Sequence, residues 1–231
     1  MSRLLAGSTL ALALSAALAA PASAQTEQVE GPYVVARAGA AIDTDAKFRD
    51  RDTAAPATFA RNADHKPGFT GEIGSGYDFG GFRLEGTIGY ANASLDRERA
   101  SGGLAAEGRT RSLDLGVAGY VDLAVSRMVV PFIGAGIGAS RVDARLSRLG
   151  GTPLAGSRYD DKDWGFRWHA DAGIGFRASP QTTIEVGARY ARVTGLRFDG
   201  VTGPAAGATA ADSFKPRLSS ISGTVGVRHV F

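Results

Sequence analysis

The chain has 231 residues and a formal net charge of +3, with 26 Lys and Arg against 23 Asp and Glu. So small a surplus of positive charge is not that of a nucleic-acid-binding domain, and no nucleic-acid partner is expected. The chain contains no cysteine, which excludes disulfides and thiolate metal sites.

The first residues have the features of a secretory signal peptide. Arg3 gives a positive start, residues 4–20 are mainly Leu and Ala, and the small residues at 22–24 form a cleavage pattern. We predict cleavage between Ala24 and Gln25. The alternative is a membrane anchor, for which the apolar stretch is short. The prediction divides the chain into a signal peptide at 1–24 and one mature domain at 25–231.

Beyond the leader, side chains alternate with a period of two, which is the pattern of β-strands. For example, Phe82, Leu84 and Ile88 share a face opposite Arg83 and Glu85. No apolar stretch there reaches the roughly 18–20 residues of a membrane helix, so a helical membrane protein is excluded. Eight segments show the alternation: 34–40, 69–77, 82–90, 112–123, 131–139, 168–176, 183–190 and 221–231.

The connections between these segments alternate between long and short. Four long, polar connections and three short ones require eight strands, with both chain ends on the side of the short turns. Outer-membrane barrels have short periplasmic turns and longer extracellular loops. The long connections are expected at 43–67, 92–111, 141–163 and 191–217, and the short ones at 78–81, 124–129 and 178–181. The stretch 200–211, rich in Gly, Ala, Pro and Thr, is expected to be mobile.

The two faces of each segment allow two interpretations. In a soluble barrel the apolar face would pack a core, whereas in a membrane barrel it faces lipid and the polar face lines the lumen. Aromatic residues near the segment ends favour the membrane barrel, because they form interfacial girdles. Glycine on the polar face fits the narrow interior of eight strands. We therefore predict an all-β fold, an eight-stranded antiparallel up-and-down transmembrane β-barrel.

Four stretches resemble recurrent strands of a known family. GFRLEGTIGY at 81–90, PFIGAGIG at 131–138, IEVGARY at 184–190 and GVRHVF at 226–231 are similar to strands of the outer-membrane β-barrel family, the OmpA-like, opacity-protein-related porin-family surface proteins. The resemblance implies localisation in the cell outer membrane and recognition of Phe231 by the barrel-assembly machinery. His229 departs from the family, in which Tyr is more usual there.

The polar faces place charges of both signs in the predicted lumen. Buried charges must be paired, so the structural interpretation is an ion-pair network that plugs the barrel, and the functional alternative is a polar gate of a narrow channel. We expect Arg37→Ala to lower thermal stability. The predicted network consists of Arg37, Glu72, Arg83, Glu85, Asp114, Asp171, Glu185, Arg189 and Arg228.

An enzyme that modifies lipid A is a further possibility, because Ser, His and a carboxylate serve such chemistry. The chain has three histidines. His65 is expected in a loop, His169 in the lumen near Asp171, and His229 at the lipid or periplasmic side. None lies in a His-x-Ser pattern, so we predict no catalytic residues and no enzymatic activity.

No cofactor and no metal site are predicted. Asp160, Asp161 and Asp163, and likewise Asp43 and Asp45, offer oxygens that suit Ca²⁺, but their spacing matches no closed site. Outer-membrane lipid and lipopolysaccharide are the expected partners. Cations of the 141–163 connection can bind lipopolysaccharide phosphates or form a solvated rim. A host or surface ligand of the loops is not specified by the sequence. The predicted role is structural, with a narrow channel as the alternative.

Overall fold

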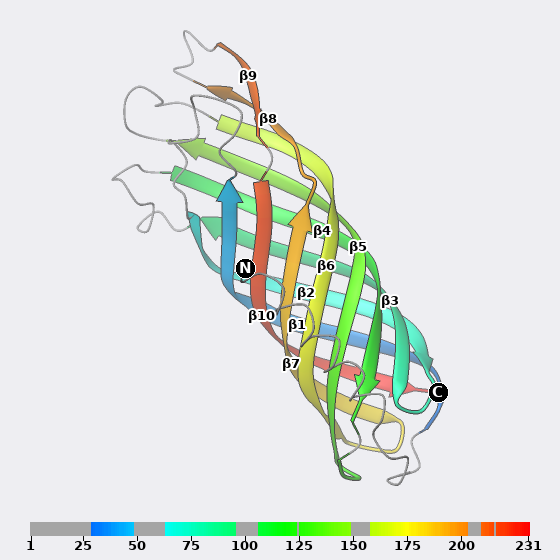
Figure 1. Ribbon diagram of the computed structural model, residues 1–231. Helices are drawn as coiled ribbons and strands as arrows, with labels where there is room; N and C mark the ends of the chain where they lie inside the picture. Colours follow the sequence, from blue (N-terminus) through cyan, green and yellow to red (C-terminus); the bar gives the residue numbers. More distant parts are fainter. Residues whose placement is uncertain are drawn as a thin grey trace, which may run out of the picture.

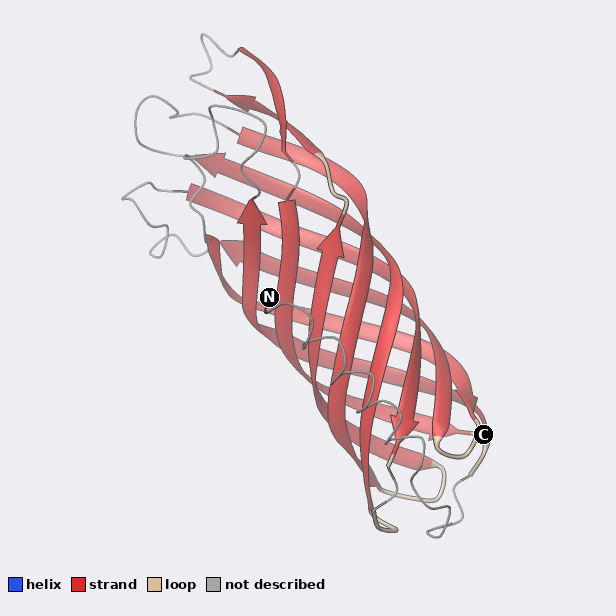
Figure 2. Ribbon diagram, viewed as in Figure 1, coloured by secondary structure: helices blue, strands red, loops and turns tan. Residues whose placement is uncertain are grey.

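A computed structural model describes residues 29–48, 63–95, 106–123, 125–148, 158–202, 209–214 and 216–231. The predicted signal peptide and its cleavage point at Ala24 and Gln25 lie outside these residues. The described residues form strands joined by short turns (Figure 2). No helix among them is long and apolar enough to cross a membrane.

Eight of the ten strands close into an antiparallel barrel (Figure 1). Neighbours in the chain pair with each other from β1 to β7, β10 pairs with β7 and β1, and the β5–β6 ladder completes the ring. The prediction of an eight-stranded up-and-down barrel is confirmed. The strands are β1 (Gly31–Phe48), β2 (Ala63–Asp78), β3 (Phe82–Leu95), β4 (Ala106–Asp122), β5 (Val129–Arg148), β6 (Arg158–Arg177), β7 (Thr182–Thr194), β8 (Phe198–Thr202), β9 (Thr209–Phe214) and β10 (Pro216–Val230).

The alternating pattern sorts side chains between the two faces of the barrel wall. Ile73 and Val117 point outward and are 62% and 61% exposed, whereas Tyr33 and Arg83 point inward and are 1% and 0% exposed. Apolar residues therefore cover the outside and polar residues fill the inside. This is the reverse of a soluble barrel and matches a barrel surrounded by lipid.

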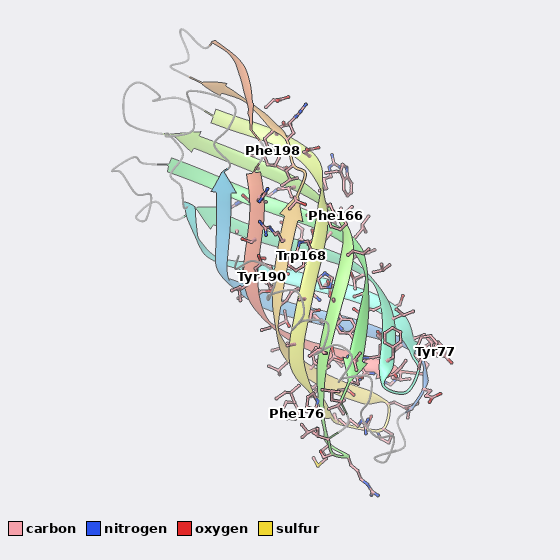
Figure 3. The ribbon with its side chains drawn as sticks, in the orientation of Figure 1. Tyr77, Phe166, Trp168, Phe176, Tyr190 and Phe198 are labelled. Carbon is pink, nitrogen blue, oxygen red and sulfur yellow. The ribbon has the colours of Figure 1, made fainter. Side chains whose placement is uncertain are left out.

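Aromatic side chains gather towards both ends of the apolar surface (Figure 3). Phe166, Trp168 and Tyr190 lie in the half nearer to β8 and β9, whereas Tyr77 and Phe176 lie nearer to the short turns. The rings of Trp168 and Tyr190 are 5.4 Å apart between centroids. Amphipathic rings are favoured at the two membrane–water interfaces, so this distribution fits two girdles.

The strands extend further than the sequence pattern indicated. The predicted long connections 43–67, 92–111 and 141–163 are shorter than expected, because strands continue into them to Phe48, Leu95 and Arg148. The next strands begin within the same connections, at Ala63, Ala106 and Arg158. Ladder hydrogen bonds do not require apolar side chains. Beyond the apolar rows the outward residues are charged, as Arg111 and Arg145 are, so the pattern of an apolar outward face ends before the strand does.

The long polar connection predicted at 191–217 also contains strands. β8 and β9 form a hairpin, and β8 pairs with the start of β6 at Arg158 and Tyr159. This hairpin projects beyond the barrel (Figure 1). Residues 203–208 of the stretch that was expected to be mobile lie outside the described residues.

The predicted short turns coincide with the ends of the strands. In the turn after β2, Gly80 and Gly81 have φ angles of +80° and +118°, which side chains rarely tolerate. The backbone N–H of Gly80 donates a hydrogen bond to Asp78 Oδ1 at 2.9 Å, which tightens the turn.

Inward glycines make room for aromatic rings. Tyr120 lies directly opposite Gly134 on the neighbouring strand, and its ring occupies the space that a Cβ of residue 134 would need. Large and small residues therefore alternate across the narrow lumen, as the interior of eight strands requires. The same arrangement pairs Tyr33 with Gly76, Phe132 with Gly173, and His169 with Gly136.

Candidate functional site

The predicted site residues project from seven different strands into the lumen. Their inward direction follows from strand parity, and the register sets their heights. Arg37 lies directly opposite Glu72, and Asp171 lies directly opposite Arg189. The site is therefore built by the barrel wall itself, from strands that pair around the ring.

Arg37 is the centre of the cluster. Its Nη1 lies 3.0 Å from Glu72 Oε1, and its Nη2 lies 3.2 Å from Glu185 Oε2. Both terminal nitrogens also contact the carboxylate of Glu85. One buried guanidinium thus serves three carboxylates, and the planar fork of arginine suits such a role.

Glu185 is the corresponding acidic centre. It accepts hydrogen bonds from Arg37, from Arg83 Nη1 at 3.1 Å and from Arg228 Nε at 3.1 Å. β3, which carries Arg83, and β7, which carries Glu185, are four strands apart in a ring of eight. The Arg83–Glu185 pair therefore spans the lumen from one wall to the opposite wall.

Towards the short turns, two further carboxylates complete the cluster. Arg83 Nη2 donates to Asp122 Oδ1 at 2.9 Å, and Arg228 Nη1 donates to Asp78 Oδ2 at 2.7 Å. Sequence reasoning omitted both acids. Asp122 lies in the predicted segment 112–123 on the same face as Asp114, which was a usable signal, whereas Asp78 falls in the predicted short connection 78–81.

Towards the other end, Arg189 joins two acids. Its Nη1 lies 2.6 Å from Glu72 Oε2, and its Nε lies 2.7 Å from Asp171 Oδ1. The hydroxyl of Tyr120 donates to Asp171 Oδ2 at 2.9 Å. The Arg83 guanidinium lies 4.8 Å from the centroid of the Tyr120 ring, so aromatic faces as well as carboxylates surround the buried cations.

Asp114 stands apart from the other predicted residues. It pairs with Arg167, at 3.4 Å between Nε and Oδ2, and Arg167 in turn contacts His169 Nδ1 at 3.1 Å. Arg167 was missed because it precedes the segment that shows clear alternation. Counting this pair, the described lumen holds five arginines and seven carboxylates: Arg37, Arg83, Arg167, Arg189 and Arg228, with Glu72, Asp78, Glu85, Asp114, Asp122, Asp171 and Glu185.

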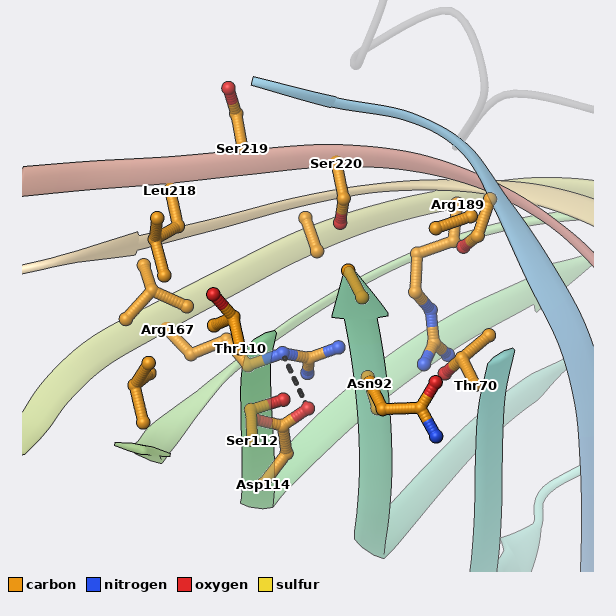
Figure 4. Close-up of a pocket in the computed structure, with 17 residues that line it drawn as sticks. Thr70, Asn92, Thr110, Ser112, Asp114, Arg167, Arg189, Leu218, Ser219 and Ser220 are labelled. Carbon is orange, nitrogen blue, oxygen red and sulfur yellow. Dashed lines mark ion pairs between the residues drawn. The ribbon is translucent and has the colours of Figure 1, made fainter. Parts of the chain in front are cut away.

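A cavity of about 110 Å³ lies beside this network, on the side of β8 and β9 (Figure 4). Arg189 and the Asp114–Arg167 pair line it together with hydroxyl groups, among them those of Thr70 and Ser112. Because Arg189 is held by Glu72 and Asp171, the charged network forms one boundary of the cavity.

Apolar side chains fill the lumen beyond this cavity. Val142 and Val193 line it and also pack in a buried cluster with Leu196 and Phe198. Gly195, with a φ of +85°, turns the chain so that Leu196 follows it inward, 0% exposed. The end of the barrel next to β8 is therefore filled by its own chain.

The acidic residues considered above for Ca²⁺ instead hold the backbone that follows Leu196. Asp163 Oδ2 accepts a hydrogen bond from the backbone N–H of Arg197 at 2.6 Å, and Asp161 Oδ2 accepts one from Asp199 N–H at 2.8 Å. Asp160 pairs with Arg145 at 3.3 Å. Among the described residues, no group of three or more His, Asp or Glu side chains is arranged to hold a metal ion. The side chains of Asp43 and Asp45 lie outside the described part.

One family model matches most of the chain. Residues 10–228 match the outer membrane protein beta-barrel domain family. The chain belongs to that family. Membership of this family implies that the protein is located in the outer membrane. No curated protein matches the chain.

Solved structures with the same fold include outer-membrane proteins of different kinds. The outer membrane protease OmpT from Escherichia coli is 9% identical with a TM-score of 0.54, over 89% of this chain and 98% of OmpT. The outer membrane protein AlkL, solved in lipid bilayers, is 15% identical with a TM-score of 0.50, over 92% of this chain and 95% of AlkL. Neisserial surface protein A is 19% identical with a TM-score of 0.48, over 87% of this chain and 97% of that protein. The likeness to OmpT and AlkL shows a common fold, and identities this low assign no activity.

The three histidines occupy different environments in this outer membrane β-barrel protein. His65 belongs to β2, opposite Leu95, so its expected place in a loop is wrong. His169 is buried in the lumen, where its Nε2 lies 3.8 Å from Asp171 Oδ2. The ring of His229 packs edge-on against Phe231, at 5.3 Å between centroids, and its Nδ1 lies 3.0 Å from Thr182 Oγ1.

Proposed function

We propose that this protein is a closed, structural barrel that supports the integrity of the outer membrane and displays its long connections at the cell surface. The observation that carries the proposal is the ion pair between Arg83 and Glu185, which crosses the full width of the lumen. Side chains that meet at hydrogen-bond distance across the barrel leave the lumen filled along that level. The neighbouring arginines, Arg37 and Arg228, also donate hydrogen bonds to carboxylates.

The proposal predicts an electrically silent barrel. The protein folded in a planar bilayer should give no stepwise conductance, because the ion pairs block the lumen. Insertion is checked on SDS gels, where a closed barrel migrates differently before and after boiling. Steady conductance steps from the unaltered protein would instead identify a channel. Such a channel should be cation-selective, since the described lumen holds more carboxylates than arginines.

The proposed orientation places the short turns in the periplasm and the hairpin of β8 and β9 outside the cell, as in barrels of this kind. The chain has no cysteine, so single cysteines report position without background. Asp199 in β8 and Ser179 in the last short turn are both exposed. On intact cells, a membrane-impermeant maleimide should label the Asp199→Cys variant and spare Ser179→Cys. Labelling of Ser179→Cys alone would reverse the orientation.

The proposal extends to the partners that the sequence indicated. Phe231 and the outward ring of His229 lie together at the end of β10, on the side of the short turns, where the assembly machinery would meet a periplasmic signal. Lipid covers the apolar rows of the barrel. A ligand of the surface-exposed connections would bind at the opposite end, on β8, β9 and their neighbours.

A further inference from the structure

Basic side chains gather on the outward face of three neighbouring strands, beyond the apolar rows. They belong to β4, β5 and β6, at the end of the barrel away from the short turns. All five are exposed. We call this surface the outer basic patch, and it consists of Arg109, Arg111, Arg141, Arg145 and Lys162.

Strand parity shows that the patch faces outward and not into the lumen. On β4, Arg109 and Arg111 share the face of Leu113 and Val117, which are exposed on the barrel surface. The ladders from β4 to β6 run without a register shift, so the same relation holds on the next two strands. The patch is therefore a direct continuation of the lipid-facing surface.

The register brings like charges together. Arg109 lies directly opposite Arg145 on the neighbouring strand, and like charges in that position destabilise a sheet unless an anion lies between them. Among the described side chains, two acids share the face. Asp160 pairs with Arg145 at 3.3 Å, and Asp143 pairs with Lys162 at 3.3 Å. Five cations against these two acids leave an unbalanced positive surface.

The height of the patch corresponds to the lipid headgroups. Arg141 lies directly opposite Leu113 on one side and Trp164 on the other, and both neighbours are exposed apolar residues. Successive outward residues of a strand are about 6.6 Å apart, so the next two rows of the patch lie within about 13 Å along the strands. A Trp beside an Arg is typical of the membrane–water interface.

We propose that the outer basic patch binds the phosphate groups of a phosphorylated glycolipid in the leaflet that surrounds this end of the barrel. Guanidinium groups bind phosphate oxygens through paired, charge-assisted hydrogen bonds. The acyl chains of the same lipid would lie against the apolar rows below, so that one ligand contacts both surfaces. The proposal rests on the proposed orientation, which directs this end of the barrel to the outer leaflet.

Binding is measured with the whole protein in neutral detergent, using lipid A that carries both phosphates as the probe. Native mass spectrometry counts bound lipid, and the fluorescence of Trp164, in a Trp168→Phe background, follows binding beside Arg141. The test variant is Arg109→Gln/Arg145→Gln. Its matched control, Arg127→Gln/Arg177→Gln, removes the same charge near the opposite end. Cold and boiled gel mobilities check that each variant is folded.

We expect bisphosphorylated lipid A to bind, lipid A without phosphates to bind at least about tenfold more weakly, and the test variant to lose about tenfold or more in affinity. The control should match the unaltered protein, and salt should weaken binding. Equal affinity for lipid A with and without phosphates would overturn the proposal without the use of any variant. Equal binding by the two variants, or tighter binding of inorganic phosphate or an anionic polysaccharide, would also overturn it.

These measurements in detergent do not depend on which end faces the cell exterior or on whether the lumen conducts. A failure of lipid A binding therefore leaves the closed barrel intact, and a conducting barrel leaves the patch intact.

Discussion

Replacing Arg37 by alanine is expected to destabilise the folded barrel by at least about 3–5 kcal/mol, the usual cost of removing one partner of a buried ion pair. Arg37 contacts three carboxylates, those of Glu72, Glu85 and Glu185, and all three are buried. Without the guanidinium, Glu85 loses its arginine partner inside the barrel, whereas Glu72 keeps Arg189 and Glu185 keeps Arg83 and Arg228. Urea unfolding in lipid vesicles, followed by the loss of cold-gel mobility, measures the change.

The control for this variant is Arg111→Ala, which removes the same group from the exposed outer surface. Its effect should stay within about 0.5 kcal/mol, as is usual for surface positions. A double variant, Arg37→Ala/Glu85→Gln, tests the cause. It should recover part of the loss, because the unpaired charge of Glu85 is gone. Equal stability of Arg37→Ala and Arg111→Ala would show that the lumenal charges are solvated and contribute little.

Replacing Gly134 by valine should prevent efficient closure of the barrel. The ring of Tyr120 fills the space that the new side chain would require, and the backbone oxygen of Gly119 lies 3.0 Å from the position of its Cβ. Overpacking usually costs about 1–3 kcal/mol, and a closed ring of ladders cannot widen locally. We therefore expect a folded yield well below that of the unaltered protein, measured as the fraction with cold-gel mobility after refolding into detergent.

The matched control is Gly86→Val, on the outward face of β3. The nearest atom to its Cβ would be the backbone oxygen of Ser75, at 3.9 Å, and valine suits a strand in contact with lipid. This variant should fold as well as the unaltered protein. A second variant, Gly134→Val/Tyr120→Ala, should recover folding if the ring is the obstacle. Normal folding of Gly134→Val alone would show that Tyr120 has another position available.

The fold could be predicted from the sequence because alternation and turn length are local signals. Segments such as 82–90 expose one face to lipid and one to the lumen, and each environment selects a different kind of side chain. The signal fails in the outer part of β5, where the pattern is reversed: Val142 and Ala144 are buried inside, whereas Arg141 and Arg145 are exposed outside. A strand with charged outward residues was therefore interpreted as a polar connection.

Membership of the lumenal network could be predicted only in part. Parity identifies inward residues, and it placed Arg83 and Glu185 correctly inside the barrel. Which of them meet depends on the stagger of strands around the ring, which no single segment specifies. Asp78 was missed because it closes β2 at the first residue of a turn, and Arg167 because it lies one residue before the segment 168–176 in which the alternation was recognised.

The closure of the ring has a kinetic consequence. Arg83 and Glu185 are carried by opposite walls, so their contact forms only when the open sheet has curled and β1 has met β10. Interactions that are absent from the transition state slow unfolding more than they speed folding. The network should therefore chiefly lower the unfolding rate of the inserted barrel. Two neighbouring strands cannot separate without also separating the ion pairs between opposite walls. An outer-membrane protein with such a network is protected by slow unfolding more than by equilibrium stability.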